Sequence, residues 1–229
     1  LELLVSEQVD GIVLCTNAPL EGGEHLRELE QKHVPLVLVD RFLTGTDADY
    51  VVSDNEAGAY QLVRYLIESG HRRIGMIVTD EPISPIRQRV AGYRRALEEF
   101  DISVDDLLIK GVDIFSQQGV TQNIESLNQA LDELMGLVSP PSCLVTMSSD
   151  LTVETLGWLM HRGIKVPQEM VLAAFDQVPL LSSLGKQLTT VAQAPFAMGT
   201  RAAQLLLERI AGNEEVEGKI KLPLELIRC

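Results

Sequence analysis

Positive charge is scarce in this chain of 229 residues. Its 19 Lys and Arg stand against 33 Asp and Glu, which gives a formal net charge of −14 at pH 7. A surface that binds duplex DNA needs clustered basic side chains to contact the phosphates. The one dense basic cluster, residues 87–95, has the spacing of an amphipathic helix. We therefore do not expect this chain to bind nucleic acid by itself.

Cysteines, aromatic residues and long apolar runs are also few. The three cysteines, Cys15, Cys143 and Cys229, are odd in number and irregularly spaced, which argues against a disulfide framework or a zinc site. Cys15 and Cys143 lie in apolar runs, so we expect them to be buried thiols of a cytoplasmic protein. No apolar run approaches the ~20 residues of a membrane span, and no secretory signal is visible. The aromatic share of 4%, beside many Leu, Val, Ile and Ala, suits an α/β protein.

Enzyme signatures are weak or absent. No GxGxxG or Walker loop follows a strand-like run. The four histidines lack HExxH spacing, and residues 183–186 match an SxxK pattern without its partner motifs. We expect no enzyme activity, no catalytic residue, no cofactor and no bound metal.

Apolar runs of strand length alternate with helix-length amphipathic segments along the chain. The strand-like runs are 12–15, 36–39, 50–52, 74–78, 107–109, 143–147 and 171–175. The helix-like segments are 23–33, 56–69, 86–100, 120–137 and 151–162. This β-α-β alternation is typical of an open, doubly wound parallel sheet.

The C-terminal part breaks the simple alternation. An irregular segment, 177–187, precedes a short strand at 188–191, and a long apolar-faced helix follows at 196–211. The tail 220–227 is expected to be one short strand, which Pro223 confines to an edge or a bulge. A chain that leaves one sheet, adds a helix elsewhere and then returns indicates two interleaved lobes.

Polar residues directly follow several of the apolar runs. They are Asp40, Thr79, Asp80, Asp113, Ser148, Ser149, Asp150 and Asp176. Ligands of open α/β sheets bind beyond the carboxyl ends of the strands, and carboxylates accept hydrogen bonds from sugar hydroxyls. An Asp after a strand can instead cap the next helix, and for Asp150 both interpretations stay open. No obvious helix follows Asp176, which favours a ligand there.

Arg89 lies early in a predicted helix, where a cation opposes the helix dipole. Such a position indicates a polar or anionic group nearby. The alternative is a solvated surface arginine.

The amino-acid sequence of several segments resembles the effector domains of bacterial transcription regulators of the lac-repressor/gal-repressor family. The strongest matches are Val-Val-Ser-Asp-Asn-Glu-Ala-Gly at 51–58 and Ser-Gly-His-Arg-Arg-Ile-Gly at 69–75. Further matches lie at 9–13, 35–41, 89–93, 163–167, 175–176, 188–191 and 225–228. The ordered set spans nearly the whole chain, which makes it far more specific than any single match.

The resemblance implies a type I periplasmic-binding-protein fold, with two α/β lobes and the effector between them. It places the chain crossings near Asp54, Val191 and Glu214. The N-terminal lobe would then comprise 1–54 and 192–214, and the C-terminal lobe 55–191 and 215–229. Family members begin with further strands and a helix-turn-helix, so we expect a longer gene product and a first lobe that is incomplete here.

The resemblance also implies the ligand-binding residues. Arg89 matches the arginine that holds the effector, and Asp176 matches the aspartate opposite it. Asp40 matches a polar contact of some members, Ser149 and Asp150 fall where an Asn-Asp pair is common, and either Phe115 or Ile114 would be the stacking residue.

The function implied is ligand sensing and dimerisation in a repressor. A small polar effector such as a sugar would bind to a homodimer, which would contact operator DNA only through an N-terminal helix-turn-helix. One alternative is a periplasmic sugar-binding component of a transporter. Another is a sugar-processing enzyme with a doubly wound fold, which would need a catalytic motif that the sequence does not show.

Overall fold

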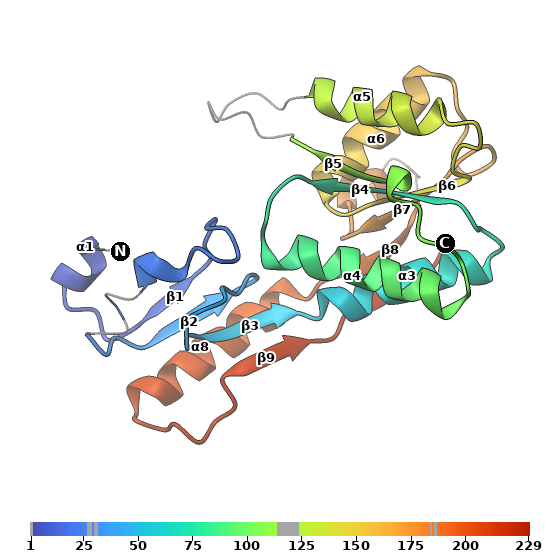
Figure 1. Ribbon diagram of the computed structural model, residues 1–229. Coiled ribbons are helices and arrows are strands. Elements are labelled where there is room, and N and C mark those ends of the chain that lie inside the picture. Colours follow the sequence, from blue (N-terminus) through green and yellow to red (C-terminus); the bar gives the residue numbers. More distant parts are fainter. Residues whose placement is uncertain (1, 27–28, 30–31, 114–123, 184, 186) are drawn as a thin grey trace. The chain divides into compact units, whose positions relative to one another are not determined.

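A computed structural model describes the chain apart from residues 1, 27–28, 30–31, 114–123, 184 and 186 (Figure 1). The contacts divide the chain into two compact units. The first unit joins the stretches Leu1–Asp54, Pro82–Arg87 and Ala194–Pro223. The second unit joins Asn55–Glu81, Gln88–Gln193 and Leu224–Cys229. Each unit contains one sheet.

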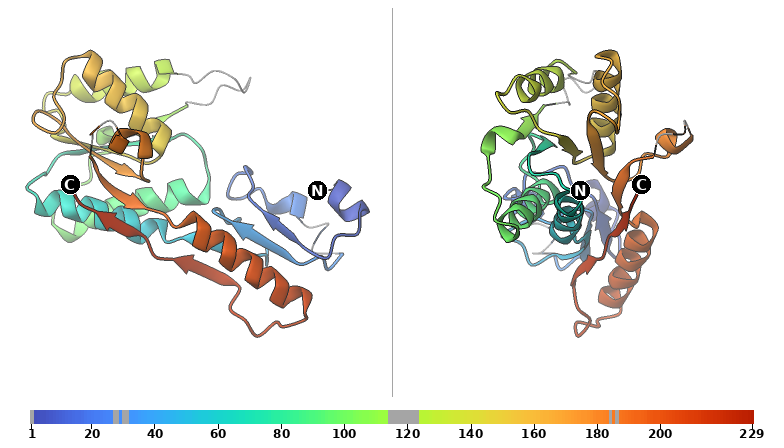
Figure 2. Two further views of the ribbon diagram at one scale, coloured as in Figure 1. Left: turned by 180° about the vertical axis from the view of Figure 1, so that it is seen from behind. Right: turned by 90° about the vertical axis from the view of Figure 1, so that its right-hand side faces the viewer.

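The first unit is built on a parallel sheet in the order β1-β2-β3-β9. Its strands are β1 (Ile12–Leu14), β2 (Leu36–Val39), β3 (Asp49–Ser53) and β9 (Lys219–Leu222). The short helix α1 (Glu2–Ser6) and the 3₁₀ helix η1 (Gly23–Leu26) also belong to this unit. Helix α8 (Pro195–Ile210) lies along β9 and β3 in Figures 1 and 2.

Both faces of the first sheet are covered, because side chains alternate along a strand. On β2, Val37 packs with Met198 and Leu205 of α8. Its neighbours Leu36 and Leu38 pack with Leu26 and other residues on the opposite face. The near-continuous apolar runs of the sequence follow from this two-sided burial.

The second unit is built on a sheet in the order β10-β8-β7-β6-β4-β5, parallel except for the β10–β8 pair. The strands are β4 (Ile74–Thr79), β5 (Ile109–Val112), β6 (Cys143–Thr146), β7 (Val171–Phe175), β8 (Thr189–Ala192) and β10 (Glu225–Ile227). Helices α5 (Ile124–Met135) and α6 (Ser149–His161) cover one face (Figure 1). Helices α3 (Asn55–Glu68) and α4 (Ser84–Glu99) lie on the other side of this sheet.

Two contacts fix the packing of α4 within the second unit. The buried Tyr93 hydroxyl donates to the Ile74 carbonyl oxygen at 2.7 Å, which ties the helix to β4. A Cβ at Gly92 would clash with the Glu56 carbonyl oxygen and lie 2.9 Å from the Tyr60 nitrogen, so only glycine allows α4 to approach α3 this closely.

The structure confirms the predicted α/β fold with largely parallel sheets, but it corrects several local predictions. The predicted strand 107–109 is the 3₁₀ helix η2 (Asp106–Leu108) followed by β5, because the Asp105 side chain accepts from the Leu107 N–H and caps a turn. The irregular segment 177–187 contains the short helix α7 (Pro179–Ser183). Cys15 is exposed rather than buried, since β1 ends at Leu14, whereas Cys143 is buried as predicted.

The expected tail strand 220–227 is two strands in different sheets. β9 pairs in parallel with β3, with Val51 opposite Ile220, and β10 pairs antiparallel with β8, with Val191 opposite Leu226. The third crossing therefore lies between Pro223 and Leu224 and not near Glu214.

The first unit also gains a stretch that the sequence did not indicate, Pro82–Arg87. Its Pro82 carbonyl oxygen accepts from the Leu20 N–H at 2.7 Å, and the Ser84 hydroxyl accepts from the Phe42 N–H at 2.9 Å. Two predicted helices reach into residues outside the described part of the chain, at 27–28 and 30–31 and at 120–123.

Candidate functional site

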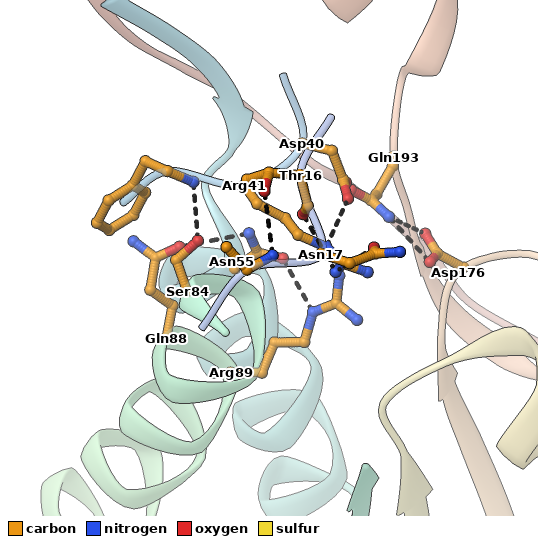
Figure 3. A network of polar contacts seen from close by, with 12 residues as sticks. Thr16, Asn17, Asp40, Arg41, Asn55, Ser84, Gln88, Arg89, Asp176 and Gln193 are labelled. Carbon is orange, nitrogen blue, oxygen red and sulfur yellow. Dashed lines mark hydrogen bonds and ion pairs between the residues drawn. The ribbon is translucent and has the colours of Figure 1, made fainter. Parts of the chain in front are cut away.

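The carboxyl end of β7 carries the first charged group of the candidate site. Phe175 is fully buried, and the next residue, Asp176, has a φ of 78°. The Asp176 N–H donates to the Val191 carbonyl oxygen at 2.8 Å, which holds this unusual backbone turn against β8. The Gln193 Nε2 donates to both carboxylate oxygens of Asp176, at 2.8 and 2.9 Å (Figure 3).

Arg89 of α4 provides the second charged group. The residue is only 6% exposed, and an unsatisfied guanidinium would be costly to bury. Its Nε donates to the Asn55 Oδ1 at 2.9 Å, and its Nη1 donates to the Met147 carbonyl oxygen. The guanidinium carbon lies 3.7 Å from the centre of the Phe175 ring, a cation–π contact. The solvated surface arginine considered from the sequence is therefore wrong.

Phe175 connects these two charged groups. Arg89 stacks on its ring, and Asp176 is its neighbour in the chain. The second unit thus places a guanidinium and a carboxylate at the same strand end, beside the residue that follows β6, Met147. Together they offer planar donors, carboxylate acceptors and a rigid support, the groups that recognise a polyhydroxylated or heterocyclic ligand.

Ser149 and Asp150 lie in the first turn of α6, directly after β6 and Met147. The cap of this helix is Ser148, whose hydroxyl accepts from the Leu151 N–H at 3.4 Å, so Asp150 is not the capping residue. The exposed carboxylate of Asp150 is favourable there, because the first turn carries the positive end of the helix dipole. A ligand contact by Ser149 or Asp150 stays a prediction.

Asp40 belongs to the first unit and repeats the backbone geometry of Asp176. It follows β2, has a φ of 69°, and donates its N–H to the Val51 carbonyl oxygen at 3.1 Å. One carboxylate oxygen lies 3.6 Å from the Arg41 Nε. The other two predicted residues, Phe115 and Ile114, lie outside the described residues.

Sequence reasoning missed three members of this cluster. Asn55, Phe175 and Gln193 are not among the ligand-binding residues predicted from the sequence. The one feature of the sequence that could have pointed to these three residues is their position, since each follows or ends an apolar strand-like run.

The described residues contain neither a cluster of metal ligands nor a membrane-spanning helix. No three His, Cys, Asp or Glu side chains gather there in a way that could hold a metal ion. None of the helices described is both long and apolar enough to cross a bilayer.

The fold and the polar strand ends define a two-unit, open-sheet α/β domain. Within that class, the family model of the periplasmic binding protein-like domain matches residues 63–228. This match covers more than half of the chain, and the chain belongs to that family.

Individual relatives are transcription regulators. The chain is 29% identical over 229 residues to the HTH-type transcriptional repressor CytR of Escherichia coli (strain K12), covering 99% of this chain and 64% of the repressor. It is similar to the crystal structure of the transcription regulator CcpA of Lactococcus lactis, with 26% identity, a TM-score of 0.82, and coverage of 99% and 79% of the two chains. A complex of the transcriptional regulator CelR with cellobiose is 25% identical, with a TM-score of 0.84 and coverage of 99% and 67%. The resemblance to lac-repressor-type regulators is therefore confirmed.

Proposed function

We propose that this chain is the effector-binding domain of a lac-repressor-type transcription repressor and that its effector is a small polar molecule such as a sugar. The observation that carries the proposal is that Arg89 stacks on the Phe175 ring at the carboxyl end of β7, where Asp176 is the next residue of the chain. An ionised carboxylate accepts from hydroxyls and a fixed guanidinium donates to ring or hydroxyl oxygens. Asp40, Ser149, Asp150 and Phe115 are proposed as further contacts.

The relatives support the wider role. CytR, CcpA and CelR are regulators or repressors of transcription, and CelR was solved in complex with cellobiose. This chain spans 64% of CytR, less than two thirds of its length. We propose that operator binding belongs to a helix-turn-helix outside these 229 residues, and that the protein acts as a cytoplasmic homodimer. The chain's net charge of −14 agrees with a domain that does not itself contact phosphates. The alternative, a sugar-binding component of a transporter, is disfavoured because these relatives are regulators.

A thermal-shift panel of sugars, sugar phosphates and nucleobases tests the proposal. Asp176→Asn and Arg89→Lys should each weaken binding of the compound that stabilises wild type, by roughly tenfold or more, since each loses a charge-assisted hydrogen bond or its geometry. Arg87→Lys, an exposed change two residues away on α4, and Glu98→Gln, exposed on the same helix, are the matched controls. If the two site variants respond as strongly as the controls, the effector does not bind here.

A further inference from the structure

Two side-chain amides stand where the chain passes between its units. Asn55 is the first residue of the second unit after the crossing that follows Asp54, and Gln193 is its last residue before the crossing to Ala194. Each amide contacts one of the two charged groups of the candidate site (Figure 3). Asn55 contacts Arg89 at 2.9 Å, and Gln193 contacts both oxygens of Asp176.

The chemistry of the partners fixes how each amide is oriented. A guanidinium has only donors, so Asn55 must present its oxygen to the Arg89 Nε. An ionised carboxylate only accepts, so Gln193 must present its NH₂ group to Asp176. The amide at the first crossing, Asn55, therefore accepts a hydrogen bond from its charged partner, whereas the amide at the second, Gln193, donates to its partner.

Both amides restrict the orientation of a charged group. The Gln193 nitrogen bonds the two Asp176 oxygens almost equally, which holds it close to the midline of the carboxylate. Arg89 is held by the Asn55 side chain, by the Met147 carbonyl oxygen and by the ring of Phe175. A guanidinium and a carboxylate whose orientations are already fixed before binding lose less conformational freedom when a ligand binds.

We infer that Asn55 and Gln193 are positioning residues that orient Arg89 and Asp176 for the effector. They also couple effector affinity to the backbone conformation of the two crossings. This inference rests on the proposed function of Arg89 and Asp176. A change of backbone conformation at residue 55 or 193 moves the amide and, through it, the charged group. Effector affinity therefore depends on the conformation of the crossings.

The donor and acceptor assignments predict opposite responses to an acidic substitution. In Gln193→Glu, two carboxylates face each other. One can donate a hydrogen bond to the other only when the pair holds a proton, and this requires low pH. In Asn55→Asp, the new carboxylate still accepts from Arg89 at both pH values, although the 3.4 Å hydrogen bond from the Asn55 Nδ2 to the Gln88 Oε1 is lost. Asn55→Ala removes the acceptor altogether, and Gln61→Glu, exposed on α3, is the matched control for added charge.

The test measures the dissociation constant of cellobiose, or of the panel compound that stabilises wild type most, at about pH 5 and about pH 8. Gln193→Glu should bind nearly as wild type at the lower pH and at least about tenfold more weakly at the higher one. Asn55→Asp and Gln61→Glu should match wild type at both, and Asn55→Ala should be weaker at both. Recovery of Gln193→Glu at low pH shows that its loss at high pH is not misfolding.

The outcomes separate this inference from the proposed function. If wild type binds and Asp176→Asn does not, but Gln193→Glu and Asn55→Ala both bind as wild type at both pH values, the positioning role is wrong and the proposed function stands. If wild type binds no compound of the panel, both are wrong.

Discussion

Gly92→Ala is expected to destabilise the second unit and to disturb the candidate site at the same time. Gly92 lies where α4 touches α3, and a Cβ there would clash with the Glu56 carbonyl oxygen. It would also lie 2.9 Å from the Tyr60 nitrogen and 3.0 Å from the Ala59 Cβ, and two of these three atoms are backbone. Backbone cannot rotate away, so the helices must separate. Arg89, one turn before Gly92, would then be drawn away from Asn55.

The net change in the free energy of unfolding is the difference between a packing cost and a gain in helix propensity. Overpacking costs about 3 kcal/mol at the upper end of its usual range, which suits a backbone clash. Alanine in place of glycine inside a helix returns about 1 kcal/mol. We expect a net loss of about 2 kcal/mol in the free energy of unfolding, or a decrease in Tm of roughly 4–8 °C for a chain of this size.

Gly157→Ala is the matched control. Gly157 also lies inside a helix of the second unit, but a Cβ there would have nothing within 4 Å. Only the propensity term applies, so this variant should gain about 0.5–1 kcal/mol. The only tryptophan, Trp158, lies in the same unit, and its fluorescence during urea unfolding reports on both variants. Equal stability of the two variants would refute the close-packing argument.

Three further predictions follow from buried groups. Tyr93→Phe should lower the free energy of unfolding by about 1–2 kcal/mol, because the Ile74 carbonyl oxygen loses its donor; an unchanged urea midpoint would contradict this. Partial burial lowers the pKa of His71 below its usual 6.5, so the unfolded chain takes up the proton first and stability should decrease as pH falls from 6.5 through the folded pKa; His71→Gln should flatten that slope in melts between about pH 7 and 5. Burial raises the pKa of the Cys143 thiol, so mass spectrometry after alkylation should find this thiol labelled only in denatured protein, unlike the two exposed cysteines.

The alternation of elements could be predicted from the sequence because local patterns encode it. The helix predicted at 56–69 is Asn55–Glu68, and the strand predicted at 74–78 is Ile74–Thr79. Sheet membership could not be predicted in the same way. Whether a short strand near Pro223 joins β3 or β8 depends on partners more than thirty residues away in the chain, and no local period records that choice.

In the candidate site too, some residues could be predicted from local sequence and others could not. Arg89 and Asp176 could be singled out because each is out of place locally, a cation early in a helix and a carboxylate after a strand with no helix to cap. Asn55, Phe175 and Gln193 look ordinary in sequence, as a cap, a core aromatic and a loop amide. Their importance arises only when folding brings α3, α4, β7 and the end of β8 together, so it could not be derived from spacing.

The backbone of Asp176 explains why an aspartate stands there and decides how its role should be tested. Asp40 and Asp176 both follow a parallel strand with positive φ, a region that Asp and Asn tolerate better than residues such as Ala. Asp176→Ala would therefore remove the carboxylate and add about 1–2 kcal/mol of backbone strain, whereas Asp176→Asn keeps the conformation and one acceptor for Gln193. In urea unfolding followed by Trp158 fluorescence, the alanine variant should be less stable than the asparagine variant by about that amount. Equal stability of the two variants would mean that the left-handed turn does not constrain this position, and an alanine substitution would then isolate the charge as well as asparagine does.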